Sequence, residues 1–578
     1  MPSEVGCACT PGGEGEPIEA LIIGVAGLLV VAAAAALAPR LRIAAPIILV
    51  VLGIVISLLP FVPPVKVSPE LILAGILPPL LYSASVSMPT MNFRREFNAI
   101  GGLSVALVVI SSFVLGLFFA WVIPGLSIWW GIALGAIVSP TDAVATSIVK
   151  RLGIRGRVVA VLEGESLLND ATALVLLRTA IAATAVSISF WGVLGSFFYA
   201  VAVAVILGFV VGHLNLWVRS KVPDATVNTV ISFTVPFLAS IPAELLGASG
   251  LVAAVVAGLV TGYGAARRLP PQHRLSDSQN WRAVELVFEG AIFLLMGLEL
   301  FAIINEVQYK DDGLGPALVI ALGAFVLTLV VRAAYVALLL AGAGRRSRRS
   351  EKVKPRLDVM QQRLDSPETL VARPGSPRPA PGPEQIERAK THTRRVLADI
   401  NYLLATPLGW REGGVLVWAG MRGAVTVAAA QTLPQQTPDR AFLVLVAFIV
   451  AASSLLIQGG TLSLVVGWLK PAGPDAEAET EERGRLLELL TTIERDIRAA
   501  HPPVVELPTD TAVDAALPTP ASFAALKRLT IQIIEAQRTA LLDARDDGTF
   551  SAEILNSALD NLDADQISIE LKGAPAGQ

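Results

Sequence analysis

The sequence predicts an all-α, polytopic membrane protein with about thirteen transmembrane helices and a helical soluble tail. Of its 578 residues, 53% are hydrophobic and only 16% are charged, and the mean hydropathy is +0.63. A soluble protein carries about 25% charged residues. Long apolar segments joined by short loops, together with an alternation of basic and non-basic loops, complete the prediction.

Thirteen apolar segments are candidates for crossing the membrane. The first is expected to remain in the protein, because residues 1–17 contain no Lys or Arg and so lack the basic region of a signal peptide. The segments are Ile18–Ala38, Ile43–Leu59, Glu70–Val86, Ala99–Val122, Ile128–Val149, Val158–Ala182, Phe190–Val218, Val227–Ile241, Gly250–Gly264, Ala283–Ile304, Gly315–Ala341, Gly414–Leu433 and Ala441–Leu469.

Basic residues are concentrated in alternate loops. The odd-numbered loops carry most of them, such as Arg94 and Arg95 in the third, whereas the even-numbered loops carry only Lys66, Lys310 and Arg440. Lys and Arg are retained on the cytoplasmic side of membrane proteins. The pattern therefore predicts a multi-pass protein of the cell membrane, with its N-terminus outside and its C-terminus in the cytoplasm.

The predicted spans divide the chain into five regions. These are an extracellular N-terminus at residues 1–17, spans 1 to 11 at residues 18–343, a cytoplasmic loop at residues 344–407, spans 12 and 13 at residues 408–469, and a cytoplasmic helical tail at residues 470–578. The loop contains a Pro-rich linker at Ser366–Pro383 and an amphipathic helix at Glu384–Leu404. In the tail, helices are expected at Thr480–Ala500, Ala524–Ala544 and Ser551–Leu562, the last two forming a hairpin.

No cofactor or resident metal site is expected. The only cysteines, Cys7 and Cys9, precede the first span without partner ligands nearby, and the four histidines are scattered. The tail contains no kinase or nucleotide-binding pattern, and neither enzymatic activity nor a nucleic-acid partner is predicted.

The fifth apolar segment is interrupted by a polar cluster. Asp142 lies mid-segment, two residues after Pro140, which removes a backbone donor and breaks the helix. Irregular backbone at membrane depth is tolerated only where it lines a cavity or is buried in protein. A carboxylate is costly in lipid, so its presence there indicates a function.

The sixth segment contains the string Glu165-Ser166-x-x-Asn169-Asp170. Glu165 and Asn169 are four residues apart, as are Ser166 and Asp170, so all four lie on one half of a helix surface. Carboxylates, a hydroxyl and an amide, with carbonyls freed at the neighbouring break, form an oxygen-rich pocket. Such ligands suit a hard cation or a proton.

These strings resemble those of the NhaP/NHE-type sodium/proton antiporters, a family that exchanges a monovalent cation for a proton. The resemblance implies a homodimer and a fold of two inverted repeats, in which two interrupted helices cross at mid-membrane. The sequence contains two such interruptions, one at Pro140 and one at Gly420 and Gly423, on either side of Arg422. Paired interruptions of this kind indicate a binding site at the crossing. The matching segments are Ile76–Tyr82, Ser139–Ala143, Leu162–Ala171, Phe288–Glu299 and Gly420–Val425.

The resemblance implies that Asp170 binds the cation and the proton in turn; a structural, hydrogen-bonded Asp is the alternative. Both ligands cannot occupy one carboxylate, so exchange follows if the protein changes conformation only when the site is neutralised. Relatives with Asn at the position of Asn169 are electroneutral, which implies one cation per proton.

Thr141, Asp142 and Ser166 complete the implied sodium site around Asp170. Thr141 would offer its backbone carbonyl, Asp142 its carboxylate and Ser166 its hydroxyl. Two of these residues have structural alternatives. Asp142 would cap the broken half-helix, and Ser166 would bond to the backbone of its own helix.

An Arg in lipid stays charged and needs a carboxylate, and the resemblance implies that Arg422 forms a structural ion pair with Glu165. Glu289 is expected either to share Arg422 or to be solvated in a cavity, and Arg332 has no assigned partner. Ser83 stands where many relatives carry Glu. This variant ligand position predicts weaker sodium binding or a changed ion preference.

The sequence thus predicts a secondary antiporter in the lipid bilayer that exchanges sodium, or another monovalent cation, for protons and serves pH homeostasis. A potassium/proton antiporter, a non-transporting ion or pH sensor, and a symporter of an organic solute are the alternatives. The complete Ser-x-x-Asn-Asp group argues against the sensor. The positions of Trp121, Trp129 and Trp130 at span ends, as interfacial anchors, argue against an aromatic solute cavity.

Overall fold

The computed structural model describes residues 16–41, 43–60, 68–154, 156–185, 190–308, 313–365, 382–471, 473, 476–501 and 520–571. All regular elements in these ranges are helices, so the predicted all-α class is confirmed. Among the described residues, nine helices are long and apolar enough to cross a membrane, and three shorter apolar helices fall within further predicted spans. The total of thirteen spans stays a prediction, and Cys7 and Cys9 lie outside the described residues.

The membrane helices pack as two bundles, here called the first and second bundle. The first contains α1 (Glu16–Leu41), α2 (Ala45–Ser57), α3 (Leu77–Ser87), α9 (Phe190–Arg219), α10 (Ala225–Leu245), α11 (Gly250–Arg268) and α12 (Pro271–Leu298). The second contains α4 (Thr90–Gly101), α5 (Val108–Val122), α6 (Ile128–Val138), α7 (Val144–Arg151), α8 (Gly156–Ala185), α14 (Leu314–Asp365), α16 (Trp410–Trp418), α17 (Ala424–Gln431), α18 (Arg440–Ser454) and α19 (Gly460–Leu469).

The two bundles meet along a short seam. Helix α8 of the second bundle contacts α3, α9 and α11 of the first, and α12 contacts α17. The connecting helix α13 (Leu300–Gln308) contacts α2 on one side and α18 on the other. A continuous apolar core joins both bundles, and part of α8 lies where the bundles face each other.

Helix α14 is much longer than a membrane span. It continues from Leu314 to Asp365 and includes Pro355. Most of the residues that follow its apolar part, such as Arg, Glu and Lys, are good helix formers. Helix α15 (Pro383–Ala405) covers the stretch expected to be helical in the cytoplasmic loop, and it packs against α14 and α21. Most of the predicted linker, residues 366–381, lies outside the described residues.

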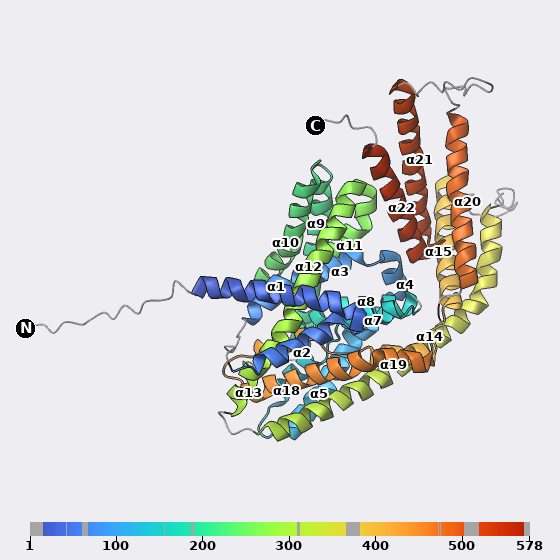
Figure 1. Cartoon of the computed structure of the whole chain (residues 1–578). Helices are drawn as coiled ribbons and strands as arrows, with labels where there is room; N and C mark the ends of the chain where they lie inside the picture. Colours follow the sequence, from blue (N-terminus) through green and yellow to red (C-terminus); the bar gives the residue numbers. More distant parts are fainter. Residues whose placement is uncertain are drawn as a thin grey trace, which may run out of the picture.

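The tail forms a helical group with its own apolar core. Helices α20 (Ala476–Ala500), α21 (Pro520–Asp547) and α22 (Ala552–Leu571) bury Leu486, Leu541 and Leu555 between them. The expected turn between α21 and α22 is made at Gly548, whose φ of 71° is accessible to glycine without strain. In Figure 1, α15 and these three helices rise together from one side of the helical body.

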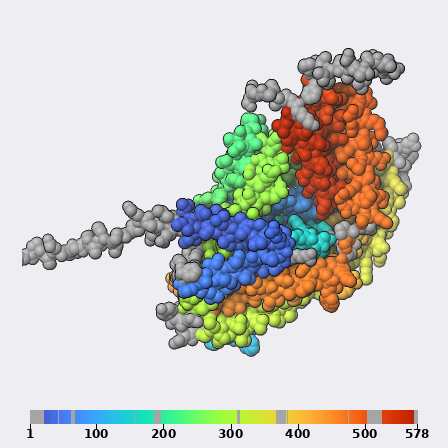
Figure 2. Space-filling view, in the orientation of Figure 1, coloured from blue at the N-terminus to red at the C-terminus, as the bar shows by residue number. Residues whose placement is uncertain are grey.

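Salt bridges to the first bundle and a hydrogen bond to the second attach the tail. Arg267 and Arg274, at the junction of α11 and α12, bind Asp546 and Asp563 of the tail. On the second bundle, Arg95 donates to the Gly548 carbonyl at 2.8 Å. The space-filling view shows the tail helices lying directly against the helical body (Figure 2). The tail is thus docked on the ends of helices from both bundles.

Candidate functional site

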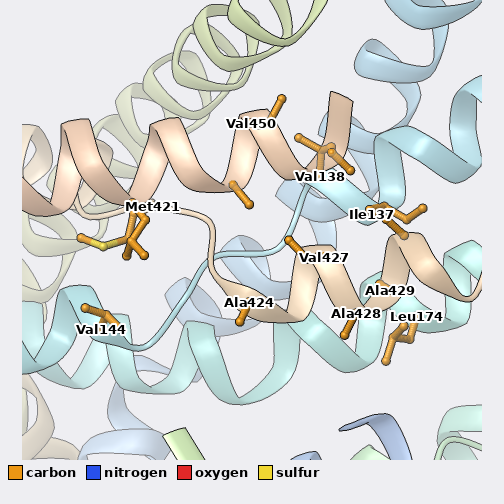
Figure 3. Packing of buried hydrophobic residues seen from close by; sticks show 14 of the residues in the cluster. Ile137, Val138, Val144, Leu174, Met421, Ala424, Val427, Ala428, Ala429 and Val450 are labelled. Atoms are coloured by element: carbon orange, nitrogen blue, oxygen red, sulfur yellow. The ribbon is translucent and has the colours of Figure 1, made fainter. Parts of the chain in front are cut away.

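Two interrupted helices cross in the second bundle, and their extended segments hydrogen-bond to each other. Helix α6 ends at Val138 and α7 begins at Val144, while α16 ends at Trp418 and α17 begins at Ala424. Figure 3 shows the chain beyond Val138 passing the chain between Met421 and Ala424. The Asp142 N–H donates to the Met421 carbonyl at 2.7 Å. Backbone groups freed by one interruption are therefore satisfied by the other, as their burial requires.

The crossing requires a glycine on one side. A Cβ added at Gly423 would lie 1.4 Å from Oδ2 of Asp142. Asp142 also accepts a hydrogen bond from the Val144 N–H at 2.9 Å, so its carboxylate faces the start of α7 and closely approaches the second chain. Asp142 precedes the N-cap residue of α7, Ala143, so its bond to the first N–H of the helix is not that of an N-cap residue. Its second carboxylate oxygen lies against Gly423.

Four of the predicted site residues line one cavity. Thr141, Asp142, Ser166 and Asp170 face a cavity of about 330 Å³ between the two bundles. Its opposite wall comes from α3 and from α12, which contributes Glu285 and Glu289. Asp170 is only 8% exposed. Ser166 donates to the Glu163 carbonyl of its own helix at 3.0 Å, and its oxygen stays within the cavity lining. The arrangement gathers carboxylate and hydroxyl oxygens, the ligands that hard cations use.

Asn169 and Glu165 lie behind this cavity, on the other side of Thr141. The Asn169 amide donates to the Thr141 carbonyl at 2.9 Å and to the Thr141 hydroxyl at 2.7 Å. The Thr141 hydroxyl in turn donates to Glu165 at 2.8 Å. With Ser111 and Ser139, these residues surround a separate, much smaller void. Asn169 therefore holds the interrupted segment in place. The spacing on α8 predicted one pocket, but the structure divides the four residues: Ser166 and Asp170 face the cavity, and the other two lie on the opposite side of the segment.

Glu165 forms its ion pair with Arg332 and not with Arg422, so the predicted pairing is wrong. Two guanidinium nitrogens of Arg332 bind the two carboxylate oxygens, one of them at 2.9 Å. Both side chains are at most 2% exposed. The third nitrogen of Arg332 donates to the Leu416 carbonyl at 2.8 Å, immediately before α16 ends.

Arg422 is held by oxygens other than carboxylates. Its Nε donates to the Val138 carbonyl at 3.0 Å, its guanidinium also binds the Gly420 carbonyl, and its backbone N–H donates to Ser454. Glu289 lines the cavity instead and forms no ion pair with Arg422 in the described part of the chain. The positively charged Arg422 thus connects the end of α6 to the second interruption through hydrogen bonds.

Sequence reasoning missed Glu285 and the Lys150–Glu163 ion pair at the cavity. Glu285 precedes Glu289 by four residues on α12, a spacing that places both on one helix face and would have indicated it. Ser83, the predicted variant ligand position on α3, is buried and does not line this cavity. Lys150 and Glu163 form an ion pair in the cavity lining, where the Lys150 side chain is 54% exposed. The cavity therefore opens at the basic end of α7.

A family model described as the transmembrane sodium/hydrogen exchanger matches residues 26–353, which is more than half of the chain. The chain belongs to the sodium/hydrogen exchanger family. The match includes the first interruption and all of α8, while the second interruption at residues 419–423 lies beyond it. The site residues on α8, Glu165, Ser166, Asn169 and Asp170, thus lie in the part of the chain that matches the family model.

Several curated relatives of this chain carry related names. The uncharacterized Na(+)/H(+) exchanger YjcE of Escherichia coli is 35% identical over 273 residues, which are 46% of this chain and half of that protein. The uncharacterized exchanger Rv2287 of Mycobacterium tuberculosis is 27% identical over 79% of this chain and 76% of its own length. A Bacillus pumilus protein named a sodium, potassium, lithium and rubidium/H(+) antiporter is 29% identical over 54% of this chain and 48% of its own.

A solved structure has the same fold as this chain. The sodium proton antiporter MjNhaP1 of Methanocaldococcus jannaschii superposes with a TM-score of 0.53 and 17% identity, covering 77% of this chain and all of that one. The architecture predicted from the resemblance is thereby confirmed at the level of the fold, and the relatives are transporters, not enzymes.

Proposed function

We propose that this exchanger is a cell-membrane antiporter that exchanges sodium for protons at Asp170. The supporting observation is the cavity between the bundles, where Asp170 and Asp142 meet Ser166 and Thr141 beside broken helices. A cation in this cavity would be held by two carboxylates, a hydroxyl and a carbonyl. A proton on Asp170 would remove the charge that attracts the cation, so the two ligands compete.

Exchange follows from this competition if the bundles move relative to each other. The cavity lies on their seam and opens at the basic end of α7, which the loop charges predict to face the cytoplasm. An empty site with its carboxylates charged would face a high barrier in a low-dielectric environment. The bundles therefore move only when the site holds a cation or a proton. Neither the cation gradient nor the proton gradient is then dissipated without the other.

A one-for-one stoichiometry is supported by the role of Asn169. Its amide donates twice to Thr141, a task that a carboxylate could not perform, so only Asp170 of the pair titrates. Moving net charge would couple transport to the membrane potential by about 2.3 kcal/mol per 100 mV for each elementary charge. We infer that the exchange is electroneutral and that the protein works as a homodimer, as the resemblance implies.

Potassium is the second candidate cation. The name of the Bacillus pumilus relative includes potassium, lithium and rubidium, and this chain has Ser83 at the variant ligand position. Glu285 and Glu289 add carboxylates on the opposite wall. A cavity with several carboxylates and few fixed oxygens selects weakly among monovalent cations of different size.

The test is proton movement in proteoliposomes that contain a pH-sensitive dye. After a pH gradient is imposed, sodium, lithium or potassium is added to vesicles with wild type, Asp170→Asn, or Glu306→Gln, which removes an exposed carboxylate on α13. We expect cation-induced proton movement in the wild type and in Glu306→Gln, and none in Asp170→Asn. Failure of every cation to move protons through folded wild-type protein would contradict antiport and favour an ion sensor.

A further inference from the structure

A second cavity, of about 650 Å³, lies where α14 changes from apolar to basic. Apart from the buried Arg332, the helix is mostly apolar through Ala341, and it then carries the basic stretch Arg345–Arg349. Helix α4, the start of α8 and the chain after α15 form the other walls, through Ala99, Arg157 and Leu408. The cavity shares no residue with the exchange site and lies at the boundary between apolar and basic surface.

One face of α14 forms the long wall of this cavity. Tyr335, Leu339, Gly342 and Arg346 recur at intervals of three or four residues, which places them on one side of the helix. A Cβ added at Gly342 would meet nothing within 4 Å, so the space beside the helix is open there. The wall therefore offers apolar side chains at one end and guanidinium groups at the other.

Two of the four arginines that line the cavity are free of carboxylate partners. Arg95 binds Asp399 at 2.8 Å and Arg157 binds Glu96 at 2.7 Å, which neutralises both. Arg346 and Arg348 are exposed and form no ion pair with any residue that the structure describes. The cavity thus presents two uncompensated positive charges next to Leu338, which is 72% exposed.

We propose that this cavity binds the headgroup of an anionic phospholipid, with the phosphate against Arg346 and Arg348 and an acyl chain beside Leu338. A guanidinium binds phosphate oxygens through parallel, charge-assisted hydrogen bonds. Basic pockets between transmembrane helices at the cytoplasmic side hold such headgroups. Free phosphate has the same anionic chemistry, but it would leave the apolar part of the wall uncovered.

The proposal is tested by native mass spectrometry of the full-length protein in detergent. Phosphatidylglycerol, phosphatidylcholine with the same acyl chains, or inorganic phosphate is titrated onto wild type and two double variants. Arg346→Gln with Arg348→Gln removes the charges that line the cavity. Arg345→Gln with Arg349→Gln removes the same charge from the same stretch but from residues outside the lining. Equal melting temperatures without added lipid show that both variants are folded.

We expect phosphatidylglycerol to bind the wild type and the Arg345/Arg349 variant alike, and the Arg346/Arg348 variant about tenfold more weakly or worse. Phosphatidylcholine should bind all three proteins equally weakly. Equal weakening in both variants would show diffuse attraction to a basic stretch and would overturn the proposal. Binding of inorganic phosphate as tight as that of the lipid would also overturn it, because the apolar wall would then have no role.

Discussion

Glu165 on α8 and Arg332 on α14 form a buried ion pair that supports the crossing from behind. Glu165 also accepts a hydrogen bond from Thr141, and Arg332 also donates to the Leu416 carbonyl. The pair thus connects α8 and α14 to both interrupted helices. Arg422 binds only backbone and hydroxyl oxygens among the described residues. The structure therefore predicts that Glu165 depends on Arg332, whereas the sequence predicted that it depends on Arg422.

Removing Arg332 should leave Glu165 buried and uncompensated. Arg332→Gln is expected to lower the free energy of unfolding by about 3–5 kcal/mol, measured by SDS titration of the protein in mixed micelles. Adding Glu165→Gln should restore much of this loss, because neither group is then charged. The control is the double variant Glu165→Gln with Arg422→Gln, which should recover no comparable stability over Arg422→Gln alone. If stability recovered in that double variant and not in Glu165→Gln with Arg332→Gln, the pairing predicted from the sequence would be correct.

A side chain at Gly423 should displace Asp142. Gly423→Ala places its Cβ 1.4 Å from the Asp142 carboxylate, and a shift that costs about 1–3 kcal/mol would slow exchange by about tenfold or more. Gly467→Ala, where an added Cβ meets nothing within 4 Å, should leave the rate unchanged. Dye-based exchange rates of the two variants give the comparison, and equal rates would show that the two chains do not approach so closely.

Protons should compete with the cation at Asp170. Below the pKa of the site, the KM for the cation is expected to rise about tenfold for each unit that the pH falls, because one proton excludes one cation. The maximum rate at saturating cation should change far less. Initial rates measured over a matrix of pH and cation concentration distinguish this from a separate pH-sensing group, which would lower the maximum rate and leave KM constant.

The tail should loosen when its contact with the membrane helices is removed. Arg274 binds Asp563, and both side chains are mostly buried, at 15% and 13% exposure. Arg274→Gln should accelerate amide hydrogen exchange in α22, since Asp563 then keeps, among the residues that the structure describes, only its ion pair with Arg538. Arg528→Gln, an exposed change on α21, is the control. Unchanged exchange in α22 would mean that docking depends on the apolar contacts alone.

Local chemistry predicted much of the site. Pro140 marks the interruption of α6 and α7 because proline removes a backbone donor, and the helical spacing of Ser166 and Asp170 places them on one face. These inferences need only a few neighbouring residues. The position of Glu285 was also accessible, since it is one turn from Glu289 within the predicted apolar span Ala283–Ile304.

Long-range partners could not be obtained in the same way. Glu165 and Arg332 are separated by 167 positions, and two buried arginines were available to one carboxylate. Choosing between them requires the relative rotation of α8, α14 and α16, which no local pattern specifies. The length of α14 was missed for another reason. Hydropathy indicates where an apolar surface ends, whereas the helix continues as long as its residues favour it.

The central claim is that one carboxylate binds either a cation or a proton, and it is tested most directly by counting protons released when a cation binds. Calorimetric titration of sodium into the purified protein in two buffers of different ionisation enthalpy gives this number. We predict about one proton released per sodium bound at a pH where Asp170 is protonated, and no proton release from Asp170→Asn. Sodium binding without proton release from the wild type, at every pH at which the protein is folded, would contradict the account.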